Sequence, residues 1–202
     1  MKQLLTYVLI LFSLATEAQV IDFNSFSEET MNEVMFSEMN GYVKKIHKGD
    51  SLIWSSVVQK YVMSDNYYFM KSNSGQNLMR LHNFKWLGRD WNDLPDTIRT
   101  KIITEMKTNY PHSEFLKVKK LENYEEYSAF TYTEILHSIT FSGSFPAITY
   151  QEIARGAIKG WNNSPPHALY MNANYKNAVI VGVATFFDKK RKTIVISFVH
   201  VS

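Results

Sequence analysis

The C-terminal third of the chain joins an amphipathic helix to a β-hairpin, and this order restricts the fold more than any other feature. Two strands are expected at 178–187 and 193–201, and a charged loop over 188–192 connects them. Before them, residues 151–161 place apolar side chains at helical spacing, on a face made of Ile153, Ala154, Ala157, Ile158 and Trp161. This arrangement predicts a helix that packs on an antiparallel sheet.

Helices dominate the earlier part of the chain. A methionine-rich apolar stripe predicts a helix over 28–47, and the spacing of Ser25 and Glu28 matches a capping box at its start. Residues 52–54 lead into a second helix, and apolar positions predict another over 96–108. Helices come first and the hairpin last, without the strand–helix–strand alternation of parallel sheets. The sequence therefore predicts an α+β fold with a central antiparallel sheet.

The N-terminal segment, 1–18, has the pattern of a signal peptide. Lys2 precedes an apolar run over 4–14, and the small residues Thr16 and Ala18 stand before a cleavage point. The apolar run is shorter than the roughly 20 residues that a membrane-spanning helix needs. We therefore expect a secreted or periplasmic protein, without a transmembrane anchor after signal removal, whose mature part is one domain.

Composition excludes several classes of protein. Apolar residues make up 45% of the chain and aromatic residues 14%, which excludes a disordered chain. The net charge of +3 comes from basic residues interleaved with acidic ones, so nothing indicates a nucleic-acid partner. Cysteine is absent, so neither disulfides nor a thiolate site can contribute to stability or chemistry.

A distinctive segment closes the last predicted helix. It reads Gly160-Trp161-Asn162-Asn163-Ser164-Pro165-Pro166-His167, and Asn172-Ala173-Asn174-Tyr175 follows it. The two stretches resemble the W-x-N-S-P-x-H and N-P-N-Y segments of the CAP superfamily, the SCP-like relatives of cysteine-rich secretory proteins, antigen 5 and plant pathogenesis-related proteins. Because cysteine is absent, the resemblance is to the bacterial, cysteine-free branch. It implies a three-layer α-β-α sandwich with a central antiparallel sheet.

Further matches are individually weak but fall in the family's order. They are the segments 39–42, 52–54, 80–81, 133–135, 182–184 and 195–201, together with Gly75. Between Arg80 and Glu134 the chain is longer than family members usually are. We therefore expect an insertion at about 82–130, which could be a lid or a partner surface, although a peripheral packing element is the favoured interpretation.

The resemblance also implies a central cleft. Many CAP domains gather two histidines and two glutamates there, a set that suits a divalent metal. By position, this chain keeps Glu134 and His167, but it carries Met70 and Ser164 where the other histidine and glutamate would stand. With Trp161 beside them, these residues are expected to form a degenerate cleft in a non-enzymatic binding module. Its implied ligands are lipids or other apolar molecules, cell-wall material or proteins.

Two enzymatic alternatives stay open at this point. The first is a metal-assisted hydrolase that uses Glu134 and His167, with a divalent metal such as zinc; His137 would be a third ligand if its segment were helical and shared a face with Glu134. Catalytic zinc usually has three protein ligands, so two are too few. The second is a serine hydrolase, but Ser164 stands at a helix end without an evident oxyanion donor.

Overall fold

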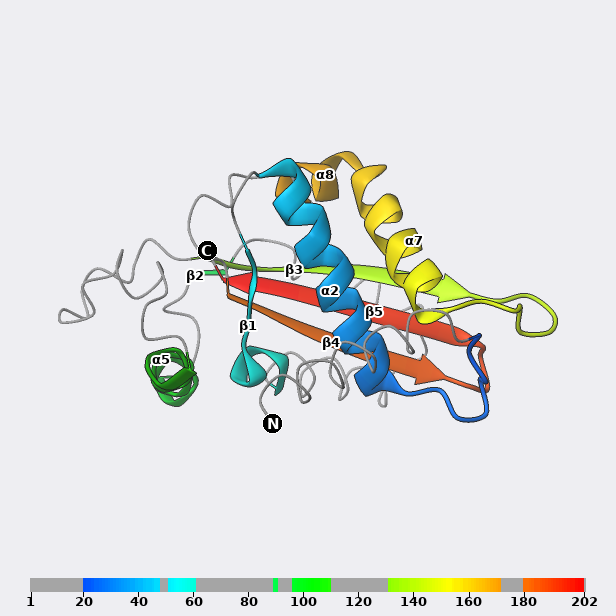
Figure 1. Ribbon diagram of the computed structural model, residues 1–202, viewed down its shortest axis with the longest axis horizontal. Coiled ribbons are helices and arrows are strands. Elements are labelled where there is room, and N and C mark those ends of the chain that lie inside the picture. The colour runs from blue at the N-terminus through cyan, green and yellow to red at the C-terminus, as the bar shows by residue number, and fades with distance from the viewer. Residues whose placement is uncertain are drawn as a thin grey trace, which may run out of the picture.

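The computed structural model describes residues 20–47, 51–60, 89–90, 96–109, 131–171 and 180–201. Nine elements are arranged along these residues (Figure 1). The helices are α2 (Glu28–Ile46), α5 (Asp96–Asn109), α7 (Tyr150–Asn162) and α8 (Pro165–Met171), and the strands are β1 (Ile53–Trp54), β2 (Arg89–Asp90), β3 (Thr131–Thr140), β4 (Ile180–Asp188) and β5 (Thr193–Val201). The chain therefore has a mixed α+β fold, as the sequence predicts.

One five-stranded sheet runs through the molecule in the order β1-β4-β5-β3-β2. The hairpin of β4 and β5 is confirmed, and the whole of β5 also pairs antiparallel with residues 132–140 of β3. The prediction of a purely antiparallel sheet is wrong at one edge. There β1 pairs parallel with β4, with Trp54 opposite Val181. A parallel neighbour needs a crossover between its strands, and here more than a hundred residues connect β1 to β4.

Three helices, α2, α7 and α8, lie on one side of this sheet (Figure 1). The face of α7 predicted from its spacing is buried, and Trp161 is only 1% exposed. The methionine-rich stripe of α2 is also buried, so its methionines are core residues, as predicted. Apolar side chains from α2, α7, β3, β4 and β5 form one core cluster. Its burial is the main source of stability in a domain without disulfides.

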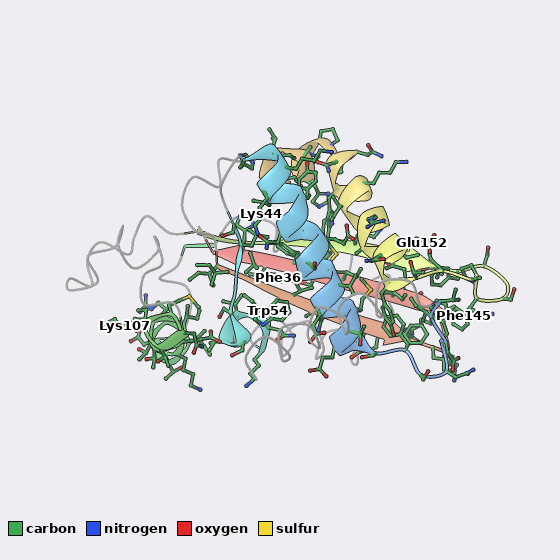
Figure 2. All side chains as sticks on the ribbon, in the orientation of Figure 1. Phe36, Lys44, Trp54, Lys107, Phe145 and Glu152 are labelled. Carbon is green, nitrogen blue, oxygen red and sulfur yellow. The ribbon has the colours of Figure 1, made fainter. Side chains whose placement is uncertain are left out.

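The helix caps differ from the prediction. The N-cap of α2 is Ser27, whose hydroxyl accepts from Thr30 N at 3.1 Å, whereas Ser25 hydrogen-bonds to Asp22. The predicted capping box is therefore wrong, and Glu28 accepts instead from the backbone N–H of Phe187 on β4. A complete capping box starts α7: the hydroxyl of Thr149 accepts from Glu152 N, and the Glu152 carboxylate accepts from Thr149 N at 2.8 Å (Figure 2). Both helices begin with satisfied donors.

Residues 56–60 are helical and approach β4 closely at Gly182. A β-carbon placed on Gly182 would lie 2.5 Å from the backbone nitrogen of Gln59 and 2.8 Å from the carbonyl carbon of Val58. Only glycine leaves room for this approach, because any side chain would meet backbone atoms rather than a movable side-chain tip. The glycine of the 182–184 segment is therefore explained by packing.

The predicted helix over 96–108 is confirmed as α5, and it docks at the start of the 56–60 segment. The carboxylate of Glu105 accepts from the hydroxyls of Ser55 and Ser56 and from the backbone N–H of Ser56 at 2.8 Å. On the inner side of α5, Ile102 and Met106 are fully buried. The carboxylate of Glu105 thus satisfies free N–H donors at the start of the 56–60 segment.

Several predictions fall outside the described residues. They concern the signal peptide at 1–18, Met70 and most of the insertion at 82–130. Among the helices that the structure does describe, none is both long enough and apolar enough to cross a bilayer.

Candidate functional site

The end of α7 is fixed to β3 by its tryptophan. The indole N–H of Trp161 donates to the backbone carbonyl oxygen of Leu136 at 2.9 Å. The same ring packs edge-to-face against His137, at 6.2 Å between ring centroids, and lies 6.2 Å from the ring of Phe198 on β5. A buried indole with a satisfied donor positions its neighbours firmly. The C-terminal end of α7 is therefore fixed relative to β3.

His137 lies directly under the last turn of α7. A β-carbon built on Gly160 would be 2.6 Å from Cε1 and 3.0 Å from Nδ1 of the His137 ring. No real β-carbon approaches that closely, so the imidazole occupies the space that a larger residue at position 160 would need. The glycine in the family-like segment thus makes room for the histidine.

His167 is the second imidazole at this end of the sheet. Burial lowers its pKa from the ordinary value of 6.5. Burial also lowers the pKa of His137, and the positive charge of His167 lowers it further. The two imidazoles are thus close enough to repel each other when protonated. Both shifts favour the neutral form of the imidazole, which has one N–H donor and one acceptor nitrogen.

The segment after α7 is a helix start rather than an open turn. Pro165 and Pro166 occupy the first positions of α8, where a missing N–H and a fixed φ are tolerated. The carbonyl of Ser164 accepts from Ala168 N at 2.7 Å, so Ser164 stands at the N-cap position. His167 therefore lies in the first turn of α8, next to the α7 terminus. The placement of Ser164 at a helix start gives it a structural role.

The remaining residues of the predicted site are described only in part. Glu134 pairs with Val199 in the register of β3 and β5, and Met70 lies outside the described residues. The segment that carries Glu134 and His137 is a strand, so the condition that they share a helix face is not met. Positions three apart in a strand belong to opposite faces. A shared helix face therefore no longer supports a metal site formed by Glu134 and His137 together.

Within the described ranges, no three side chains of His, Cys, Asp or Glu gather in a way that could hold a metal ion. The residues that the structure does bring together are His137, Trp161 and His167. Sequence reasoning named all three but did not predict that His137 packs on Gly160. A glycine inside a helical pattern was the available signal, because such a residue costs helix stability and usually has a packing reason.

A groove of about 580 Å³ runs between α2 and α7 and reaches Asn162 at the end of α7. Two interactions cross it. The hydroxyl of Tyr42 donates to Asn162 Oδ1 at 2.6 Å, and the guanidinium of Arg155 holds both carboxylate oxygens of Glu38, at 3.0 and 2.9 Å. These contacts tie the turn after Trp161 to the first helix and add to its fixed position.

His200 differs from the other histidines, because it is buried inside the sheet region. Burial lowers its pKa to about 4. It stands opposite Val181 and Thr133 in the register of the sheet, two positions beyond Phe198 and on the same face. It is therefore neutral at physiological pH.

Comparison with known proteins adds no further assignment: the chain matches no protein-family model, and no curated protein or solved structure is significantly similar to it.

Proposed function

We propose that this chain is an exported, bacterial SCP-like CAP-domain protein that acts as a non-enzymatic binding module. The order of elements supports the family assignment: a helix, a short strand, a long strand, the tryptophan helix and a terminal hairpin. A hydrogen bond joins two of the family-like segments, because Leu52 N donates to Asn40 Oδ1 at 2.9 Å. The buried Trp161 anchors the end of α7 to β3, ahead of the terminal strands, and this agrees with the resemblance.

The proposed architecture is a three-layer α-β-α sandwich. The packing of α2, α7 and α8 on one side of the sheet supports one helical layer (Figure 1). The approach of Val58 and Gln59 to Gly182, and the attachment of α5 through Glu105, support a second layer. The sheet would then be buried on both faces.

The observation that carries the binding function is the group of His137, Trp161 and His167. Its two imidazoles are partly buried, the His137 ring packs against the buried Trp161, and an imidazole can both donate and accept hydrogen bonds. The family's metal set is incomplete in the sequence, since Met70 and Ser164 carry no metal-ligating carboxylate or imidazole. The ligand that we propose for this group is an apolar or lipid-like molecule, a cell-wall fragment or a protein segment.

Zinc titration tests the non-enzymatic assignment. We expect the unfolding temperature of the purified mature protein to stay unchanged when zinc is added at micromolar concentration. His167→Ala should respond like the control His47→Ala, which changes the histidine at the C-cap of α2. Saturable stabilisation by zinc that is lost in His167→Ala and kept in His47→Ala would overturn the assignment, because a ligand that binds only the folded state raises its stability.

One observation favours a second candidate, a metal-assisted hydrolase with Glu134 as base. The family positions alone supply Glu134 and His167. The proximity of His137 to His167 adds a second imidazole as a possible metal ligand. If this candidate is correct, the protein hydrolyses members of a peptide and ester panel, and a chelator abolishes the activity. A panel without turnover in the presence of added zinc excludes it.

A further inference from the structure

A second recess lies away from the histidine site, where β1 passes the first turns of α2. It has a volume of about 350 Å³, and its lining consists of Glu29, Asn32, Glu33, Phe36, Trp54 and Gln59. Figure 2 shows Phe36 and Trp54 close together at this place. None of these residues belongs to α7, α8 or β3. We propose that this recess binds a small organic cation with an alkylammonium group. The proposal is independent of the function assigned to the histidine site.

The strongest sign of a ligand is the side chain of Asn32. It is 1% exposed, and among the described residues neither its Oδ1 nor its Nδ2 has a hydrogen-bond partner. Leaving a buried amide unsatisfied costs about 1–3 kcal/mol, and native proteins rarely retain such a group without a reason. A ligand in the recess supplies the missing partner, because Asn32 is part of its lining.

The charge of the lining selects the kind of ligand. Glu29 and Glu33 are exposed carboxylates one helical turn apart, and the described lining contains no basic side chain to neutralise them. Glu29 lies in the first turn of α2, where a negative charge also complements the helix dipole. That role accounts for a carboxylate at the helix start. It does not account for the unsatisfied amide between the two glutamates.

The aromatic pair distinguishes an organic cation from a metal ion. The rings of Phe36 and Trp54 pack edge-to-face, with centroids 5.1 Å apart and an angle of 88° between their planes. Ring faces attract alkylammonium groups through their quadrupole, and tryptophan does so best. Calcium and magnesium prefer shells of oxygen ligands without aromatic walls. The volume of about 350 Å³ lies in the range of small-ligand pockets.

Calorimetric titration with choline chloride tests the proposal, and 3,3-dimethyl-1-butanol, a neutral molecule of nearly the same shape, is the matched control. We expect saturable binding of choline that weakens with added salt, and at least tenfold weaker binding of the alcohol. Equal binding of both compounds, or no saturable heat from choline at millimolar concentrations, would overturn the proposal.

Variants locate the binding. Glu33→Gln should weaken choline binding about three- to fivefold, which corresponds to the loss of one solvent-exposed ion pair, and Trp54→Leu should weaken it about fivefold. Glu38→Gln removes the same charge from the same helix but does not line the recess, so it should change the affinity less than twofold. All three variants are checked for the native circular dichroism spectrum. If Glu33→Gln and Glu38→Gln have the same effect, choline binds elsewhere and the proposal fails.

Discussion

Replacing Gly160 with alanine should destabilise the fold, whereas the same change at Gly156, one turn earlier in α7, should stabilise it. Both glycines lie inside the helix, where alanine is favoured by about 1 kcal/mol over glycine. A β-carbon at position 156 has no atom within 4 Å, so this gain should be realised. The two variants are matched, because both introduce the same substitution into the same helix and only the surroundings of the new β-carbon differ.

At position 160 the new β-carbon would lie 2.6 Å from the His137 ring, so the imidazole or the helix has to move. Overpacking of this kind costs about 1–3 kcal/mol, which cancels or exceeds the propensity gain. We therefore expect Gly160→Ala to be about 1–3 kcal/mol less stable than Gly156→Ala. Urea unfolding followed by far-UV circular dichroism measures both free energies of unfolding.

A double-mutant cycle identifies the cause of the loss. In a His137→Ala background the obstructing ring is absent, so Gly160→Ala should become as stabilising as Gly156→Ala. If Gly160→Ala is stabilising in the wild-type background, or if its penalty persists without the ring, then α7 does not rest on His137 and the geometry of the site is wrong.

Three further predictions follow from the packing and from the buried charges. Gly182→Ala should cost about 3 kcal/mol or more in urea unfolding, because its β-carbon would meet the backbone of 58–59, and a cost below 1 kcal/mol would contradict that close approach. Glu105→Gln should cost about 1–3 kcal/mol, measured in the same way, since the amide replaces a charged acceptor of several hydrogen bonds; an unchanged free energy of unfolding would mean that α5 does not dock through this group. The pKa of His200 is about 4 in the folded state, below its ordinary value of 6.5, so the unfolded chain takes up a proton that the folded one does not. Stability from this group is complete above pH 6.5 and falls by about 1.4 kcal/mol per pH unit between pH 6.5 and 4, and His200→Gln should reduce that slope in unfolding measured from pH 7.5 to 5.

The elements with a clear period were predictable from the sequence. The apolar face of α7 and the alternation of β5 follow directly from side-chain spacing, and both elements are found within one residue of the predicted limits. The wrong predictions concern choices that spacing does not determine. Serine is a common capping residue, so the sequence offers both Ser25 and Ser27 as the N-cap of α2. The structure uses Ser27, and Glu28 bonds to the distant Phe187 instead of completing a capping box with Ser25.

The pairing of β1 depends on contacts far apart in the chain. Residues 52–54 do lead into a helical segment at 56–60, but the sequence does not predict that Ile53 and Trp54 also add a parallel strand next to β4. Two residues carry no period, so only the completed sheet edge determines their conformation. The same limit applies to the site. The motif led to Trp161 and His167, whereas the packing of His137 under Gly160 depends on how α7 crosses β3.

The central claim is that His137 and His167 share one site, and a pH titration of the histidine ring signals by NMR tests it most directly. We expect both rings to titrate below 6.5, since burial lowers both pKa values. In His167→Ala the pKa of His137 should rise, because the neighbouring positive charge is removed, while His47→Ala should leave it unchanged. A pKa of His137 that does not respond to His167→Ala would contradict the claim.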